Sequence, residues 1–196
     1  MLADENGRRA LLQGIVELTR AVFAAKACSI MSHDAAAHEL VFEAVAGEGA
    51  GTLVGRRIPA TTGLAGWSLA SEEPIAISDV GSDPRFAREV AEQTDFVPTR
   101  MSVHPLLYGE RSLGVLSVLD QCAGQPVGLA DMNVLARIAT HAGAVLAIVQ
   151  AVREAESVLA DGGELASIER VLASAPAPQR EAALALLAAL ERLLSE

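Results

Sequence analysis

The sequence is poor in aromatic residues, and this limits how its core can be built. Aromatic residues make up 3 % of the 196 residues, whereas 51 % are hydrophobic. The core must therefore consist of alanine, valine, leucine and isoleucine. That apolar fraction suffices for a folded domain and excludes wholesale disorder. The length suits one domain of ordinary size, or one domain with an appendage.

Positive charge is also scarce, and this bears on the choice of partner. The formal net charge is −10, with 15 Lys and Arg against 25 Asp and Glu. An acidic surface repels phosphate backbones and anionic lipids. We therefore expect neither a nucleic-acid partner nor a membrane partner.

Signals for export, for membrane insertion and for disulfides are missing. The first residues, MLADENGRRALLQG, lack the apolar run of a signal peptide. No uninterrupted apolar stretch reaches the ~20 residues needed to cross a bilayer. Cys28 and Cys122 alone do not make a disulfide framework. These absences predict a cytoplasmic protein.

Apolar periodicity and turn residues predict an α+β domain with an antiparallel sheet over residues 1–160. Thr62 is expected to cap one short helix and Pro84 to open another. Pro105 predicts an edge strand or a β-bulge, because proline cannot donate to a ladder. The expected elements are helices at 8–25, 62–73 and 85–93, a long helix from 129, strands at 28–32, 40–46, 58–59 and 75–77, and a hairpin over 99–120.

The remaining residues, 161–196, predict a helical tail of two short helices. Asp161–Gly162–Gly163 breaks the long helix, and the Ala-Pro repeat at 175–178 is a stiff hinge. Helices this short are marginal alone in water, so the tail must dock on something. Its Leu-rich face either packs on the domain or binds an effector protein.

Four segments, in this order, resemble the GAF domain family. They are TTGLAGWSLASEEPIAISDV (61–80), SDPRF (82–86), HPLLYGERSLGVLSVLD (104–120) and VGLADMNVLARIATHAGAVLAI (127–148). The resemblance runs from about Arg8 to Ala151. It implies a central sheet with the terminal helices on one face and a ligand pocket on the other. It also implies a regulatory sensor of small molecules in signal transduction, not an enzyme.

The resemblance and strand alternation together suggest where the ligand pocket lies. The loop-rich middle layer carries Trp67, Phe86 and Phe96, and the Met101 face of its strand should point toward them. Asp79 either recognises a polar ligand or stabilises its own loop. The sequence requires no cofactor, and haem and a nucleotide stay open. The candidate pocket residues are Trp67, Asp79, Phe86, Phe96, Met101, Val103, Ser117 and Leu119.

Heptad-like seams on the terminal helices predict a homodimer. The candidate interface residues are Ile15, Leu18, Leu135, Ile138, Val145 and Val149. A bound ligand would shift these helices only by binding one of their arrangements better than the other. The signal would then pass to a partner protein.

Two rival interpretations are a free methionine-(R)-sulfoxide reductase and a ligand-free dimerisation scaffold. Reductases of the GAF family need cysteines on the pocket loops around the middle helix and the second hairpin. Cys28 and Cys122 match neither position, so we predict no catalytic residue.

The histidines do not predict a metal site. His33, Asp34 and His38 lie in one hairpin connection, where a solvated turn is favoured because no fourth ligand is evident. Histidine binds haem in some GAF relatives. Strand alternation, with the resemblance, turns His104 toward the terminal helices and away from the pocket. His141 is a weaker candidate still.

Overall fold

The computed structural model describes residues 5–92, 96–121 and 127–160. The chain divides into two compact units, residues 1–150 and 151–196, and the account below concerns the first. The predicted tail at 161–196 and Cys122 lie outside the described residues.

Helices and strands follow each other in the predicted order. The sheet has six strands in the order β3-β2-β1-β6-β5-β4, and each neighbouring pair is antiparallel. The α+β class and the antiparallel sheet are therefore confirmed. The elements are α1 (Glu5–Val22), β1 (Ala27–Asp34), β2 (Glu39–Gly47), η1 (Ala50–Thr52), β3 (Arg57–Pro59), α2 (Gly63–Ser71), β4 (Ile75–Ile77), η2 (Val80–Ser82), α3 (Arg88–Glu92), β5 (Met101–Tyr108), β6 (Arg111–Leu119) and α4 (Leu129–Ala160).

The second hairpin turns where its glycine predicts. Tyr108 pairs with Arg111, and Gly109 in the two-residue turn has a φ of 60°, which glycine adopts without steric cost. The register shifts between Pro105 and Leu107. β4 pairs only with Met101–Val103 of β5, so Pro105 lies beyond the end of β4, at a bulge and at a position where β5 has no neighbouring strand of the described chain on that side, as its sequence predicts.

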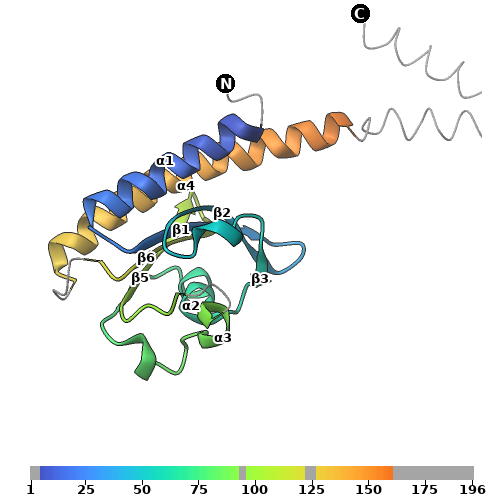
Figure 1. Cartoon of the computed structure of the whole chain (residues 1–196). Helices are drawn as coiled ribbons and strands as arrows, with labels where there is room; N and C mark the ends of the chain where they lie inside the picture. The colour runs from blue at the N-terminus through green and yellow to red at the C-terminus, as the bar shows by residue number, and fades with distance from the viewer. Residues whose placement is uncertain (1–4, 93–95, 122–126, 161–196) are drawn as a thin grey trace, which may run out of the picture. The chain divides into compact units, whose positions relative to one another are not determined.

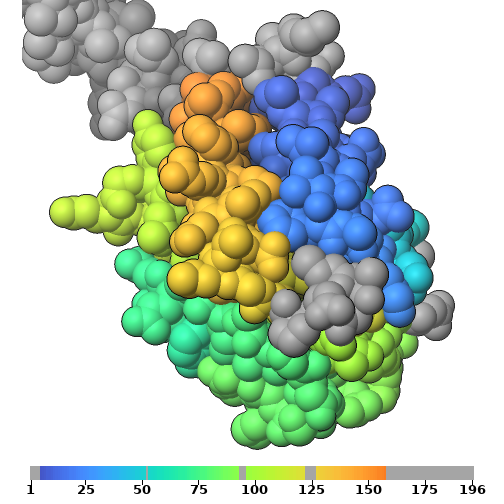
Figure 2. All heavy atoms as spheres, turned by 90° about the vertical axis from the view of Figure 1, so that its left-hand side faces the viewer, coloured from blue at the N-terminus to red at the C-terminus, as the bar shows by residue number. Residues whose placement is uncertain are grey.

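The terminal helices cover one face of the sheet, and the short helices lie on the other (Figure 1). α1 and α4 run side by side in both views (Figures 1 and 2). Their buried residues form one core cluster with Ile30, Leu116 and Val118 of the sheet. Burying each valine, leucine or isoleucine side chain of this cluster contributes roughly 1.5–3 kcal/mol. The helix residues in this cluster are Leu12, Val16, Leu135, Ala139, Ala142, Leu146 and Val149.

α4 is more apolar than the sequence analysis anticipated. By length and composition, the segment Leu129–Ser157 could cross a membrane. Leu135, Leu146 and Val149 of this segment are fully buried in the core cluster between the terminal helices and the sheet. Part of its apolar composition therefore serves the core of the domain, whereas Leu129, Val134 and Ile148 of the same helix are exposed.

One local expectation about the short helices is wrong, and a second is confirmed in position only. α3 begins at Arg88, not at residue 85. The Asp83 carboxylate accepts hydrogen bonds from the backbone N–H and the guanidinium of Arg85, and this local bonding competes with a helical turn. Thr62 does precede α2, but its side chain makes no capping hydrogen bond.

Candidate functional site

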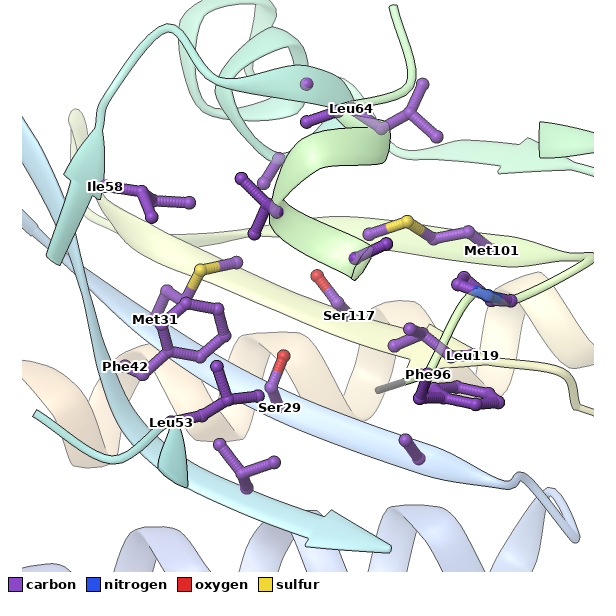
Figure 3. A pocket seen from close by; sticks show the side chains of 18 of the residues that line it. Ser29, Met31, Phe42, Leu53, Ile58, Leu64, Phe96, Met101, Ser117 and Leu119 are labelled. Carbon is purple, nitrogen blue, oxygen red and sulfur yellow. The ribbon is translucent and has the colours of Figure 1, made fainter. Parts of the chain in front are cut away.

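A pocket opens on the face of the sheet opposite α1 and α4. β1, β2 and β6 supply one wall, and α2, α3 and their flanking loops supply the other (Figure 3). Its cavity volume, the space open to the centre of a water-sized sphere, is about 110 Å³. One water needs roughly 10–15 Å³ on this measure, and a cavity of roughly 150 Å³ can bind benzene. The pocket therefore has room for a small organic molecule.

Strand alternation explains which side chains reach the pocket. In β1, Ser29 and Met31 face the pocket, whereas Ile30 belongs to the core cluster between the sheet and the terminal helices. Cys28 belongs to the same cluster, although it is also among the residues that border the pocket. In β6, Ser117 faces the pocket between two residues that point away. Each central strand therefore separates pocket from helices by the thickness of one backbone.

Two serine hydroxyls are the polar groups that the sheet presents to this largely apolar pocket, and Thr62, before α2, is a further hydroxyl residue on its wall. Ser29 and Ser117 are direct partners in the β1–β6 register, and both hydroxyls point into the pocket (Figure 3). Their residues are 6 % and 1 % exposed. Within the described part of the chain, the Ser117 Oγ has no hydrogen-bond partner. Leaving a buried hydroxyl unpaired costs roughly 1–3 kcal/mol.

The pocket wall carries almost no charge. Glu48 is the one charged residue on it among the described residues, and this side chain is exposed to solvent. No lysine, arginine or histidine of the described chain lines the pocket. An anion would therefore find no counter-charge there.

An ion pair and an aromatic ring support the loop above the pocket. The Arg85 guanidinium lies 2.7 Å from the Asp83 carboxylate and 5.1 Å from the centre of the Trp67 ring. The hydrogen bond from Arg85 lowers the pKa of Asp83 to about 2. These contacts hold the segment that brings Phe86 and Ala87 to the pocket wall.

The eight predicted pocket residues divide into two groups. Phe86, Phe96, Met101, Ser117 and Leu119 line the pocket. The remaining three lie behind the wall or outside it: Val103, Trp67 and Asp79.

Each of these three residues has a structural partner. Val103 is fully buried in the adjoining core cluster. Trp67 stacks beneath Arg85. Asp79 accepts a hydrogen bond from the Gly81 N–H at 3.2 Å, which is the loop-stabilising alternative for this residue. None of the three is among the residues that line the pocket.

The part of the pocket wall that comes from the first hairpin, β1 and β2, was not predicted from the sequence. Ser29, Met31 and Phe42 line the pocket, as do Leu53 and Ile58 beyond them. Alternation in β1 was a usable signal for Ser29 and Met31. The contribution of Leu53 follows only from the path of the chain after β2.

Cys28 is placed unfavourably for nucleophilic chemistry. Its side chain is fully buried in the core cluster between the terminal helices and the sheet. Burial raises the pKa of the Cys28 thiol to about 12. The thiolate that would attack a substrate is therefore scarce at neutral pH.

His104 faces the terminal helices, as alternation predicts. It pairs with Leu116, which belongs to the helix-side cluster. Burial lowers the pKa of His104 to about 4, so the ring is neutral at pH 7.

The hairpin connection of β1 and β2 is held by ion pairs. The Arg57 guanidinium contacts both Asp34 and Glu39, and Asp34 also accepts from the Ala37 N–H. Among the described residues, no three His, Cys, Asp or Glu side chains gather as a metal site would require.

The predicted dimer residues differ in how much surface they offer. Leu135 and Val149 are fully buried within their own chain. They belong to the core, and their prediction as interface residues is wrong. Ile138 and Val145 are partly buried, as is Ile15. The sixth residue, Leu18, is 61 % exposed.

Comparison with known proteins identifies the fold and the family. No curated protein matches the chain. The GAF domain of a phosphoenolpyruvate-protein phosphotransferase from Coxiella burnetii is 22 % identical, with a TM-score of 0.67, covering 74 % of this chain and 84 % of that one. A fragment of a methyl-accepting chemotaxis protein is 17 % identical, with a TM-score of 0.64, covering 74 % and 92 %.

An enzyme is also among the similar structures. Free methionine-R-sulfoxide reductase from Neisseria meningitidis is 22 % identical, with a TM-score of 0.59, covering 76 % of this chain and 83 % of that one. At such identities the likeness concerns the fold alone. The GAF domain profile, by contrast, matches residues 7–146, most of the chain. With its six-stranded sheet, terminal helices and pocket, the chain belongs to the GAF domain family.

Proposed function

We propose that this GAF domain is a regulatory sensor that binds a small molecule in the pocket and relays its presence through α1 and α4 to a partner protein. GAF domains are commonly regulatory modules of this kind. The observation that carries the proposal is the pocket itself, with an unpaired buried hydroxyl, Ser117 Oγ, on its floor.

The central strands provide a short route from ligand to helices. Ser117 lies on the pocket side of β6, and its neighbours Leu116 and Val118 pack in the cluster with α1 and α4. A ligand that moves β6 would therefore disturb that packing directly. It changes the helix arrangement only as far as its affinities for the two arrangements differ.

We also propose that the sensor works as a homodimer. The terminal helices keep large apolar side chains on their outer surface even though one face of each is buried. A second copy could cover this surface, because soluble monomers rarely leave a large apolar surface exposed to water. The exposed residues are Leu11, Leu18, Val22, Val134 and Ile148.

The proposal includes the absence of thiol catalysis. It is supported by the burial of Cys28 and by its raised pKa. The enzyme remains the second candidate because a methionine sulfoxide reductase shares the fold.

Fragment binding followed by hydrogen exchange tests the sensor function. Native mass spectrometry of the full chain against a library of small fragments identifies a bound fragment, and hydrogen exchange is then measured with and without it. We expect altered exchange in α1 and α4, weaker in Ser117→Val, which fills part of the pocket.

Two other outcomes would contradict the proposal. If fragments bind and the exchange of both helices is unchanged, the domain binds ligands without signalling through its helices. If no fragment binds, the scaffold interpretation is the correct one.

A further inference from the structure

We propose that the pocket selects small uncharged molecules with an apolar body and one hydrogen-bonding group, and that Ser29 and Ser117 bind that group. This inference rests on the proposed sensing function and names the chemical class of its ligand.

The two hydroxyls are placed to share one polar atom. Ser29 and Ser117 face each other across the β1–β6 ladder, where the Cβ atoms of direct partners lie about 4.5–5.5 Å apart. Both hydroxyls point into the same space (Figure 3). A hydroxyl can donate or accept, so the pair suits an alcohol, a carbonyl or an amide equally.

The burial of Ser117 indicates that a ligand completes its hydrogen bonding. Its residue is 1 % exposed, and its Oγ has no partner among the described residues. Ser102 of β5 is also buried and unpaired, but it does not line the pocket. Ser117 therefore differs from Ser102 in having a cavity beside it, and this makes Ser102 a matched control.

The charge of the wall disfavours anions. An ionised group in an apolar pocket loses its hydration, and this loss is expensive unless an opposite charge compensates it. No described cationic side chain lines the pocket, and the Glu48 carboxylate at its wall repels anions further. The first turn of α2, Gly63–Ala65, also borders the pocket and is the one feature of the described wall that favours an anion; without a cationic side chain beside it, an uncharged polar group is preferred to a carboxylate or a phosphate.

The remaining lining accounts for the apolar body of the ligand. Met31 and Phe42 lie on one side of the serine pair, Phe96 and Met101 on the other, and Leu64 lies across the pocket from it (Figure 3). The cavity volume of about 110 Å³ limits the enclosed part of the ligand to at most about one unsubstituted ring, because the cavity that binds benzene has roughly 150 Å³.

Three probes that share one ring separate these contributions. Benzyl alcohol carries a neutral hydroxyl, toluene carries no polar group, and benzoate carries a negative charge at pH 7.5. Their affinities for the full chain are measured by ligand-observed NMR titration. We expect benzyl alcohol to bind about three- to tenfold more tightly than toluene, the gain of one net hydrogen bond. Benzoate should bind at least about tenfold more weakly than benzyl alcohol.

Two variants assign the preference to the serine pair. Ser117→Ala should abolish the advantage of benzyl alcohol over toluene and leave the affinity for toluene unchanged. It should also keep the fold, because it removes an unpaired buried group, and circular dichroism checks this. Ser102→Ala, on the opposite face of the sheet, should leave all three affinities as in the wild type.

The outcomes distinguish failure of this inference from failure of the sensing function. Benzoate binding as tightly as benzyl alcohol would overturn the uncharged ligand class and leave the sensing function standing. An unchanged preference in Ser117→Ala would overturn the role of the serine pair. No binding by any of the three probes would overturn the inference, whereas the sensing function would fall only if the fragment library also gave no bound fragment.

Discussion

Buried polar residues of the sheet lie on both of its faces, and their surroundings give them different roles. Ser117 borders a pocket, whereas Ser102 and His104 point toward the terminal helices. In the described part of the chain, one polar atom of each lacks a partner. On the pocket side a ligand can supply that partner. On the helix side the unpaired atom is a cost to stability.

Protonation of His104 should make the domain less stable in mild acid. Burial lowers its pKa to about 4, whereas an unfolded chain has a histidine pKa near ~6.5. Between these values the unfolded state binds the proton and the native state does not. Stability is therefore complete above the unfolded pKa and falls as the pH drops toward the folded one.

The expected size of this effect is measurable by urea unfolding. The free energy of unfolding should fall by about 1 kcal/mol between pH 7 and pH 5.5. His104→Leu should remove this part of the pH dependence. An equal fall in wild type and variant would show that His104 is not the group responsible.

Cys28 should be unreactive in the folded protein. Its thiol is buried, and its pKa is raised to about 12. In a Cys122→Ser background, a water-soluble disulfide reagent should label Cys28 only after unfolding. Free methionine sulfoxide should not be turned over by the wild type. Turnover that Cys28→Ser abolishes would favour the reductase interpretation.

Among the elements, α1 and α4 both contain glycine, and Gly14 and Gly143 have different surroundings. A Cβ on Gly143 of α4 would lie 2.7 Å from the backbone oxygen of Leu107 in β5. A Cβ on Gly14 of α1 would meet nothing within 4 Å. The helix–strand contact at Gly143 therefore depends on the missing side chain, and the exposed position at Gly14 does not.

Alanine at these two glycines should change stability in opposite directions. Gly143→Ala must push α4 away from backbone atoms, and overpacking of this kind costs about 1–3 kcal/mol. Gly14→Ala should stabilise by about 0.5–1 kcal/mol, because alanine favours the helix and restricts the unfolded chain. Urea unfolding of both variants measures the difference. A stabilising Gly143→Ala would show that α4 does not sit this close to β5.

For the molecule as a whole, the outer surface of the terminal helices is the feature that the described residues do not cover. Leu18 and Val22 of α1 and Ile148 of α4 are all more than half exposed. Removing such side chains from water is worth about 25 cal/mol per Å². A second copy of the domain can supply the cover.

Sedimentation of the full chain tests the homodimer. Wild type should sediment as a dimer at micromolar concentration, and Leu18→Glu should sediment as a monomer with unchanged circular dichroism, because the substituted side chain is exposed. Val54→Glu is the control: Val54 is also exposed, but it lies in the loop before β3. A dimer that survives Leu18→Glu would place the contact elsewhere.

The sequence by itself determined the order of elements, the two hairpins and the family. These follow from local signals: period-2 and period-3.6 patterns, the turn at Gly109, and motifs such as that around Trp67. It also indicated five of the residues that line the pocket. Local signals failed where a competing local bond won, as between Asp83 and Arg85 ahead of α3.

Only the tertiary structure decided which apolar residues line a pocket and which fill a core. Leu135 and Val149 look like seam residues along the helix, yet they are buried against the sheet of their own chain. Ser29 and Ser117 are 88 residues apart in sequence and become neighbours only when β6 pairs with β1. The physical reason is that a periodic pattern shows which side of an element is apolar. What covers that side depends on contacts between segments far apart in the chain.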